Sequence, residues 1–244
     1  MLPPGGNIFT NQSRGVVLVH EDVAGWKSTG GVDLLARSRD GKTLEERQKT
    51  TGLLQMAALN TMARDCGKAL QSRPQTIIME RHFDSNCLFG NYMHSVGLID
   101  DLSFAVWKAH LDAIREMLQA MSSVIDFTHI YIRVSPDVAT KQAQKRGYDS
   151  DIPLQLNTDL HKAHELLFMD HKLAFPGKIV IIDNDGSPEE LQAKIMSIVF
   201  PQGCDSPLNV IPPAFDRVKL FSLNGTIGAG NAHNLLLLIL NSKP

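Results

Sequence analysis

Four short apolar runs, each rich in β-branched residues, alternate along the chain with longer segments of helical periodicity. The runs are 16–19, 76–79, 129–134 and 178–183, and the helical segments are 44–69, 98–121, 137–145, 156–170 and 188–199. Runs that are apolar at consecutive positions are typical of strands buried on both faces of a parallel sheet. Strand alternating with helix indicates crossover units, so we predict an α/β fold with a parallel sheet flanked by helices on both sides.

The two ends of the chain differ in composition from this core. Residues 1–15 are rich in Pro, Gly and Asn, which predicts a flexible lead-in, and residues 201–217 carry four prolines, as a linker would. After the linker, residues 218–223 form one more apolar run, followed by a glycine loop and an apolar stretch that ends at Leu240. We therefore expect one core at 16–200 and a strand, a loop and a helix start within 218–244.

Charge and cysteine content exclude several classes of protein. The 24 basic and 26 acidic residues give a net charge of −2, and no run of Lys and Arg marks a nucleic-acid-binding face. Three cysteines without a C-x-x-C pair favour neither a disulfide framework nor a zinc ribbon. The longest apolar run, 235–240, is too short to span a bilayer, and the first 13 residues lack the Lys or Arg of a signal peptide. We expect a soluble cytoplasmic protein without nucleic-acid or membrane partners.

The glycines at 225, 228 and 230 follow a strand and precede a helical segment, as in a loop that cradles phosphate groups. Such a loop also needs a Lys for the β/γ-phosphates and a Ser or Thr hydroxyl for Mg²⁺. Asn231 and Ala232 occupy those two positions. By spacing alone, the segment is equally a plain strand-to-helix turn.

Charged residues follow two of the predicted strands, at the sheet edge where open parallel sheets bind ligands. Glu21 follows the run 16–19 and can accept a hydroxyl proton, although a lone acid there is more often a solvated turn residue. Glu80 and Arg81 follow the run 76–79, where they could hold a metal shell and a phosphate or form a surface ion pair.

Two further groups have an ordinary and a functional interpretation. Lys145 and Arg146 belong to a basic cluster that would suit a segment closing over phosphates, or else a solvated helix face. His161 and His164 lie three residues apart beside Glu165, but without a third ligand this pair favours helix packing or capping over a metal site.

Taken in order, these segments resemble the deoxynucleoside kinase family. The resemblance covers roughly 16–200 and 218–230. It rests on 16–26, where the family has a strand followed by Glu-Pro-Val and Trp, on Met79-Glu-Arg-His82, where the family has Glu-Arg-Ser, and on 130–136, 145–147 with 152–154, and 160–165.

The resemblance implies a P-loop NTPase-like three-layer sandwich with about five parallel strands, and ATP-dependent, Mg²⁺-requiring phosphorylation of the 5′-hydroxyl of a deoxynucleoside. It implies that Glu21 is the general base, that Arg81 positions that carboxylate and the phosphate, and that Glu80 supports Mg²⁺ indirectly. A homodimer is expected only by analogy with helix-rich folds of this kind.

The resemblance also implies roles in binding the substrate and the phosphate donor. Substrate-binding residues are Trp26, Gln48, Phe89 and Arg39: Trp26 lines the nucleoside pocket, Gln48 pairs with the base edge, Phe89 stacks on the base, and Arg39 falls near the usual sugar-binding Tyr. Glu46 competes with Gln48 because the register through 44–54 slips by a residue or two. Lys145 and Arg146 belong to the lid, and the ATP-binding loop contains Gly225, Gly228, Gly230 and Asn231.

Several departures from the family pattern keep alternatives open. The phosphate loop comes last, which fits a circular permutation or a break-point between two tandem kinase units. Asn231 and Ala232 replace the loop Lys and hydroxyl residue, which a reading-frame change just after Gly230 would also explain. His82 replaces Ser, Ser85 or Asn86 stands where a second Arg is usual, and Tyr148 replaces a lid Arg. Besides an active kinase, the sequence therefore fits a catalytically impaired nucleoside- or nucleotide-binding protein, or a nucleoside monophosphate kinase.

Overall fold

The computed structural model describes residues 8–11, 15–121, 123–146, 154–170, 173, 177–184, 187–201 and 218–225. The strands are β1 (Ile8–Asn11), β2 (Val16–Val19), β3 (Thr76–Glu80), β4 (Ile125–Arg133), β5 (Lys178–Asp183) and β6 (Val218–Gly225). The helices are α1 (Val23–Trp26), α2 (Leu34–Asp40), α3 (Leu44–Gln71), α4 (Phe83–Ser95), α5 (Asp101–Ala120), α6 (Pro136–Arg146), α7 (Leu154–Met169) and α8 (Pro188–Val199).

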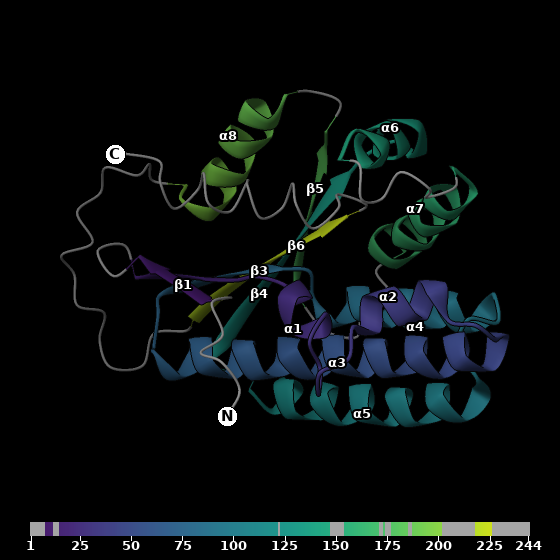
Figure 1. The fold of residues 1–244 in the computed structure, drawn as a ribbon. Coiled ribbons are helices and arrows are strands. Elements are labelled where there is room, and N and C mark those ends of the chain that lie inside the picture. Colours follow the sequence, from purple (N-terminus) through teal and green to yellow (C-terminus); the bar gives the residue numbers. More distant parts are fainter. Residues whose placement is uncertain are drawn as a thin grey trace.

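The strands form one sheet in the order β1-β2-β3-β6-β4-β5. Strands β2 to β6 run parallel, and β1 is antiparallel to β2 at the edge. The last described strand, β6, lies in the middle of the sheet between β3 and β4 (Figure 1). The α/β prediction is thus confirmed, with a parallel five-strand sheet flanked by helices, as in P-loop NTPase-like kinases.

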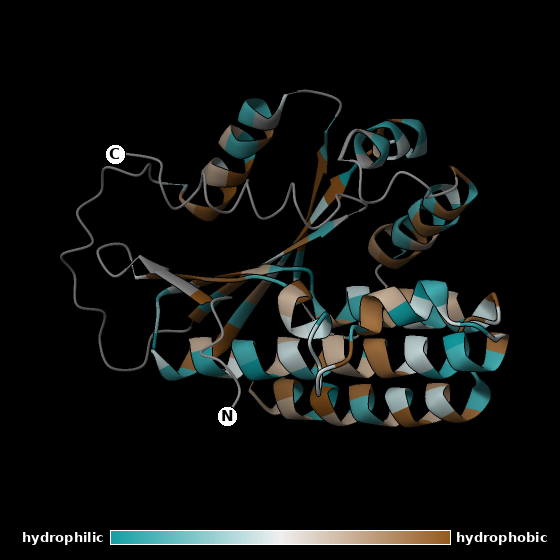
Figure 2. Cartoon of the chain, in the orientation of Figure 1, coloured by the Kyte–Doolittle hydropathy of each residue, from teal (hydrophilic) through white to brown (hydrophobic). Residues whose placement is uncertain are grey.

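Helices cover both faces of the sheet, because consecutive apolar residues of each strand point to opposite sides. Val17 and Val19 of β2 face α3, α4 and α5, where Trp107 and Leu111 are fully buried. Val16 and Leu18 face the opposite layer, which α6 and α8 supply. The hydropathy colouring shows the apolar sheet between the partly polar helices (Figure 2).

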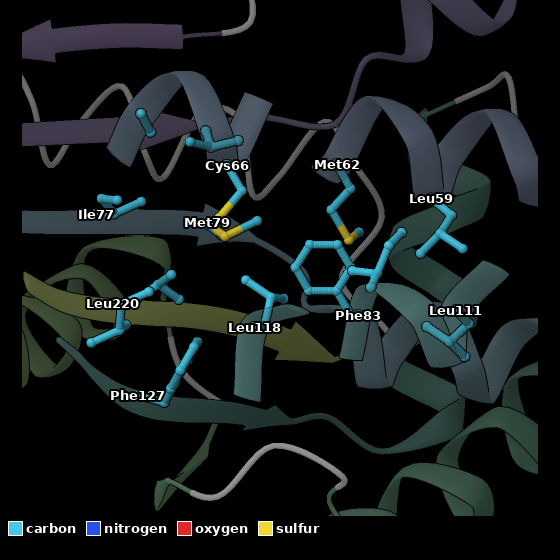
Figure 3. Packing of buried hydrophobic residues seen from close by; sticks show 14 of the residues in the cluster. Leu59, Met62, Cys66, Ile77, Met79, Phe83, Leu111, Leu118, Phe127 and Leu220 are labelled. Carbon is cyan, nitrogen blue, oxygen red and sulfur yellow. The ribbon is translucent and has the colours of Figure 1, made fainter. Parts of the chain in front are cut away.

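The larger cluster contains sulfur-bearing and aromatic side chains between β3 and the helices. Figure 3 shows Met79, Phe83 and Leu118 meeting there, beside Cys66 of α3. Each such fully buried side chain stabilises the fold by about 1.5–3 kcal/mol. No helix among the described residues combines the length and the apolarity needed to cross a membrane.

Helix ends follow the capping signals of the sequence. Ser187 and Glu190 form a capping box at the start of α8, with Pro188 in the first turn. Thr43 caps α3 by accepting a hydrogen bond from the Glu46 backbone N–H. Each helix thus begins directly after a residue whose side-chain oxygen accepts a hydrogen bond from a free backbone N–H of the first turn.

The structure also differs from the sequence-based expectation. The stretch expected to be a lead-in contains β1, in which Ile8 pairs with Val19 and so extends the sheet edge. Three helices, α1, α2 and α4, were not expected, because they are short or interrupted by Gly and Asn. Of the expected linker and glycine loop, residues 202–217 and 226–244 lie outside the described residues.

Gly90 of α4 is a position where only glycine fits. A Cβ there would lie 2.3 Å from two ring carbons of Trp107. We expect Gly90→Ala to lower the free energy of unfolding by about 1–3 kcal/mol, because a tightly packed core accommodates added volume poorly. Chemical denaturation would measure this loss.

Gly67 of α3 provides the matched control. It is also helical, but apart from its neighbours and the backbone of its own helix no atom of the described residues lies within 4 Å of a Cβ built on it. Gly67→Ala should raise the free energy of unfolding by about 0.5–1 kcal/mol through helix propensity. Equal effects of the two substitutions would contradict the assigned packing of α4 on Trp107.

Candidate active site

The carboxyl ends of β2, β3 and β6 meet at one edge of the sheet and bring charged side chains together. Glu21 lies two residues beyond β2, and Glu80 is the last residue of β3. Glu80 is paired in register with Leu223 of β6. The backbone N–H of Arg81 donates to the Leu223 carbonyl at 2.8 Å, which fixes the end of β3 against the central strand.

Glu21 and Arg81 form an ion pair at this edge. Arg81 Nη1 lies 3.3 Å from Glu21 Oε1, and the Glu21 side chain is only 6% exposed. Arg81 has a φ of 64°, a left-handed conformation that is unfavourable for a residue with a side chain and is typical of functional sites. Its guanidinium lies 4.6 Å from the ring centre of Phe89 in α4, a cation–π contact.

Glu80 contacts the backbone of Glu21 and the side chain of His20. Glu80 Oε2 accepts a hydrogen bond from the Glu21 backbone N–H at 3.3 Å and lies 3.4 Å from His20 Nδ1. Among the described residues, Glu80 Oε1 has no hydrogen-bond partner. A Mg²⁺ site uses one or two carboxylates together with substrate phosphates and water, so a buried carboxylate with one oxygen unused fits such a site.

Burial changes the acidity of Glu21. Loss of solvent raises its pKa to about 7, Arg81 opposes this rise, and the Glu80 carboxylate adds to it. A carboxyl group with a pKa near the working pH is suited to accept and release a proton. The edge therefore holds a group able to act as a general base beside a fixed cation.

A family model described as deoxynucleoside kinase matches residues 6–201. The chain belongs to the deoxynucleoside kinase family. A fowlpox virus (strain NVSL) protein named as a probable deoxycytidine kinase is 24% identical over 210 residues, which cover 80% of this chain and 84% of that protein. The family confirms the resemblance on which the site roles were predicted.

Trp26, predicted to line a deoxynucleoside kinase's nucleoside pocket, ends α1 and is 8% exposed. Its indole Nε1 donates to Thr61 Oγ1 of α3 at 3.1 Å. The helical turn that directly follows Glu21 is thus attached to the long helix α3. The positions of Glu21 and Trp26 therefore both depend on the contact between this turn and α3.

The structure gives Gln48 a partner away from the strand ends. Gln48 Nε2 donates to the Gly97 carbonyl, just beyond α4, at 2.9 Å. Glu46, the competing candidate, accepts from the Lys42 backbone N–H at 3.0 Å. Neither side chain is brought to Glu21 by a contact in the structure.

Gln55 is a polar residue that sequence reasoning missed. It lies on α3, seven residues or two turns after Gln48, on the same face, and is 9% exposed. Its side chain makes no hydrogen bond with another described residue. The signal was present in the sequence, because Gln55 shares the buried stripe of α3 with Leu59 and Met62 at positions i, i+4 and i+7.

Other predicted site residues are placed less closely or not at all. Arg39 is exposed near the end of α2. Lys145 and Arg146 are the last two residues of α6, and Gly225 ends β6. Gly228, Gly230 and Asn231 lie outside the described residues, as does Tyr148.

Phe89 belongs to an aromatic layer that joins α4, α7 and β4. His164 of α7 lies edge-on to Phe89, with ring centres 6.2 Å apart, and stacks on Tyr131 and Phe168. Its Nδ1 donates to the Leu160 carbonyl at 2.7 Å, and burial lowers its pKa to about 4. His164 is therefore a neutral packing residue. The described residues contain no group of three or more His, Cys, Asp or Glu side chains that could hold a metal ion by themselves.

The residues after Arg81 that depart from the family pattern have structural roles. His82, in place of the family Ser, still caps α4, because its Nδ1 accepts from the Asp84 backbone N–H at 3.3 Å. Ser85 is fully buried, and Asn86 Oδ1 accepts from the Trp107 indole at 3.1 Å. The two positions considered for a second Arg thus point into the protein, and Arg81 is the cation that the structure places beside Glu21.

Proposed function

We propose that this family member is a deoxynucleoside kinase that transfers the γ-phosphoryl group of ATP to the 5′-hydroxyl of a deoxynucleoside. The observation that carries the proposal is the Glu21–Arg81 pair at the carboxyl ends of the parallel strands. The base is almost fully buried, and the adjacent cation is partly exposed. Such an arrangement suits phosphoryl transfer, in which positioning and charge stabilisation supply most of the catalysis.

In this reaction Glu21 accepts the proton of the 5′-hydroxyl. The 5′-oxygen forms a bond to the γ-phosphorus, and the bond from that phosphorus to the β–γ bridging oxygen of the donor breaks. Arg81 keeps Glu21 oriented and offers its remaining N–H groups to the phosphoryl oxygens. Trp26 and Phe89 provide apolar surfaces on which a nucleoside can pack.

Glu80 is the residue that would face Mg²⁺, through the oxygen that does not contact Glu21 and His20. Bound Mg²⁺ would neutralise charge on the donor phosphates. Lys145 and Arg146, at the end of α6, are proposed as lid cations for the same phosphates. The glycines from Gly225 to Gly230 are proposed as the donor loop.

The test is a transfer assay with γ-labelled ATP and each of the four deoxynucleosides in turn. A labelled deoxynucleoside monophosphate that depends on Mg²⁺ and on Glu21 supports the proposal. No product above that of a Glu21→Gln control, with all four acceptors, would rule it out. Adding deoxynucleoside monophosphates as competing acceptors tests the nucleoside monophosphate kinase alternative.

Gln48 and Gln55 are two candidates for the amide that pairs with the base edge. We expect Gln55→Leu to raise the KM for the deoxynucleoside by about 5–30-fold, because a lost hydrogen bond costs about 1–2 kcal/mol. Gln48→Leu should change this KM less, since the Gln48 amide already bonds to Gly97. The KM of each variant is measured at saturating ATP, and the reverse order would assign the role to Gln48.

A second candidate function is nucleoside or nucleotide binding without catalysis. Asn231 and Ala232, in place of the loop Lys and hydroxyl residue, favour it. It predicts thermal stabilisation by deoxynucleosides but not by ATP, and gain of transfer activity in an Asn231→Lys variant. Stabilisation of the unaltered protein by ATP with Mg²⁺ would contradict it.

We further propose that residues 218–244 are the first strand, phosphate loop and first helix of a permuted kinase domain. The central position of β6, beside the strand that carries Glu80, supports this proposal. A rearranged chain in which 218–240 precede residue 14 should fold and retain ligand binding. If that chain unfolds, the permutation proposal fails.

A further inference from the structure

The turn that carries Glu21 is attached to α3 through the carboxylate of Asp22. Asp22 follows Glu21 directly and caps α1. Its Oδ1 accepts from the Gly25 backbone N–H at 2.9 Å, and its Oδ2 accepts from Arg64 Nη2 at 3.0 Å. Arg64 lies on α3, so the contact joins two segments that are 42 residues apart.

Arg64 is itself held rigidly. Its Nε and Nη2 donate to the two oxygens of Asp65, both at 2.7 Å, and the Asp65 side chain is 3% exposed. These carboxylate partners raise the pKa of Arg64, so its charge is permanent. A planar guanidinium fixed by two parallel bonds loses little further freedom when it binds a third oxygen.

The Asp22 carboxylate packs closely against Gly25 of α1. A Cβ on Gly25 would lie 2.3 Å from Asp22 Oδ2, so the carboxylate occupies the space that a side chain would need. Thr61 provides the second attachment, one helical turn before Arg64, by accepting from the Trp26 indole. The turn after Glu21 therefore contacts α3 at two points about one turn apart.

We propose that Arg64 is a positioning residue for the reaction: through Asp22 it fixes the backbone on which Glu21 stands, and so the placement of that base against Arg81. The inference rests on the proposed function. Glu21 is then held from both sides, by Glu80 at its own N–H and by Arg64 at the next residue. A misplacement of about 1 Å at a reacting group can cost about 100-fold in rate.

The experiment compares Arg64→Met, Asp22→Asn and the double variant with Lys68→Met. Lys68 is the matched control, because its Nζ lies 3.9 Å from Asp65 and it does not contact Asp22. We expect Arg64→Met to lower kcat by about 10–100-fold while the KM for ATP stays within twofold. The double variant should be no slower than Arg64→Met, because both substitutions break the same contact, the one between Arg64 and Asp22. Arg64→Lys should recover part of the rate, and it serves as the main variant if Arg64→Met does not fold.

Hydrogen exchange of the segment 20–27 is the second measurement, and it does not depend on activity. Exchange there should be faster by about fivefold or more in Arg64→Met and unchanged in Lys68→Met. Faster exchange with an unaltered kcat would overturn the positioning role and leave Arg64 purely structural, and unaltered exchange would overturn the attachment itself. If the unaltered protein transfers no phosphoryl group, the proposed function fails instead, which the transfer assay shows separately.

Discussion

Replacing Glu21 by Gln is expected to lower the transfer rate by about 10²–10⁴-fold, because the amide keeps the shape of the side chain but cannot accept the hydroxyl proton. The loss should fall on kcat rather than on the KM for the deoxynucleoside. Glu45→Gln is the matched control, because Glu45 is an exposed acid on α3 that, among the described residues, forms an ion pair with Lys49. Steady-state kinetics of both variants, with the unaltered protein, measure the effect.

The same residue predicts a pH dependence. Since the pKa of Glu21 is about 7 in the folded protein and 4.5 in the unfolded chain, kcat/KM should fall about tenfold per pH unit below pH 7. The folded state binds this proton more tightly than the unfolded state, so the carboxyl group lowers stability as pH rises from 4.5 to 7, by up to about 3 kcal/mol. Denaturation at pH 5 and pH 8 should show a smaller difference in Glu21→Gln. An identical difference in both proteins would contradict the raised pKa.

Arg81→Met should lower kcat by about 10²–10³-fold, the usual cost of removing one preorganised donor from a developing charge. Arg81 also lowers the pKa of Glu21, so its removal should move the acidic limb of the pH profile above pH 7. These two effects have separate causes, and the pH profile distinguishes them.

Arg81→Lys separates charge from geometry. It keeps the cation, so the acidic limb should stay near its original pH, whereas kcat should recover only in part, because Lys lacks the planar fork. Full recovery of kcat by Lys would show that Arg81 acts as a point charge alone. An unshifted limb in Arg81→Met would contradict the electrostatic contact with Glu21.

Much of the sheet could be predicted from the sequence because its strands are continuous apolar runs. The runs 16–19 and 178–183 match β2 and β5, and the segment 188–199 matches α8 with its capping box. The helix α4 could not be found in this way. Gly90 and several polar residues weaken its periodicity, and its burial depends on Trp107, a residue of another helix.

The charged part of the site was predictable for the same reason. Glu21 and Arg81 each follow a recognisable strand, and parallel strands bring their carboxyl ends to one edge. The residue proposed to pair with the base edge was harder to predict, because the register through 44–54 left Gln48 and Glu46 in competition. Gln55 became a candidate only through its burial on α3. The attachment of Asp22 to Arg64 was also invisible, since no local pattern links residues so far apart.

The position of β6 has a consequence for synthesis. Because β3 and β4 each pair with β6, the sheet cannot close until residues 218–225 have left the ribosome. At about 5–20 residues per second, the nascent chain waits several seconds after β4 with two unpaired strand edges exposed. Exposed edges of apolar strands recruit other chains, so this interval is where we expect chaperones to be needed. Slow decoding between β4 and β6 would then lower the yield of folded protein without changing a single residue.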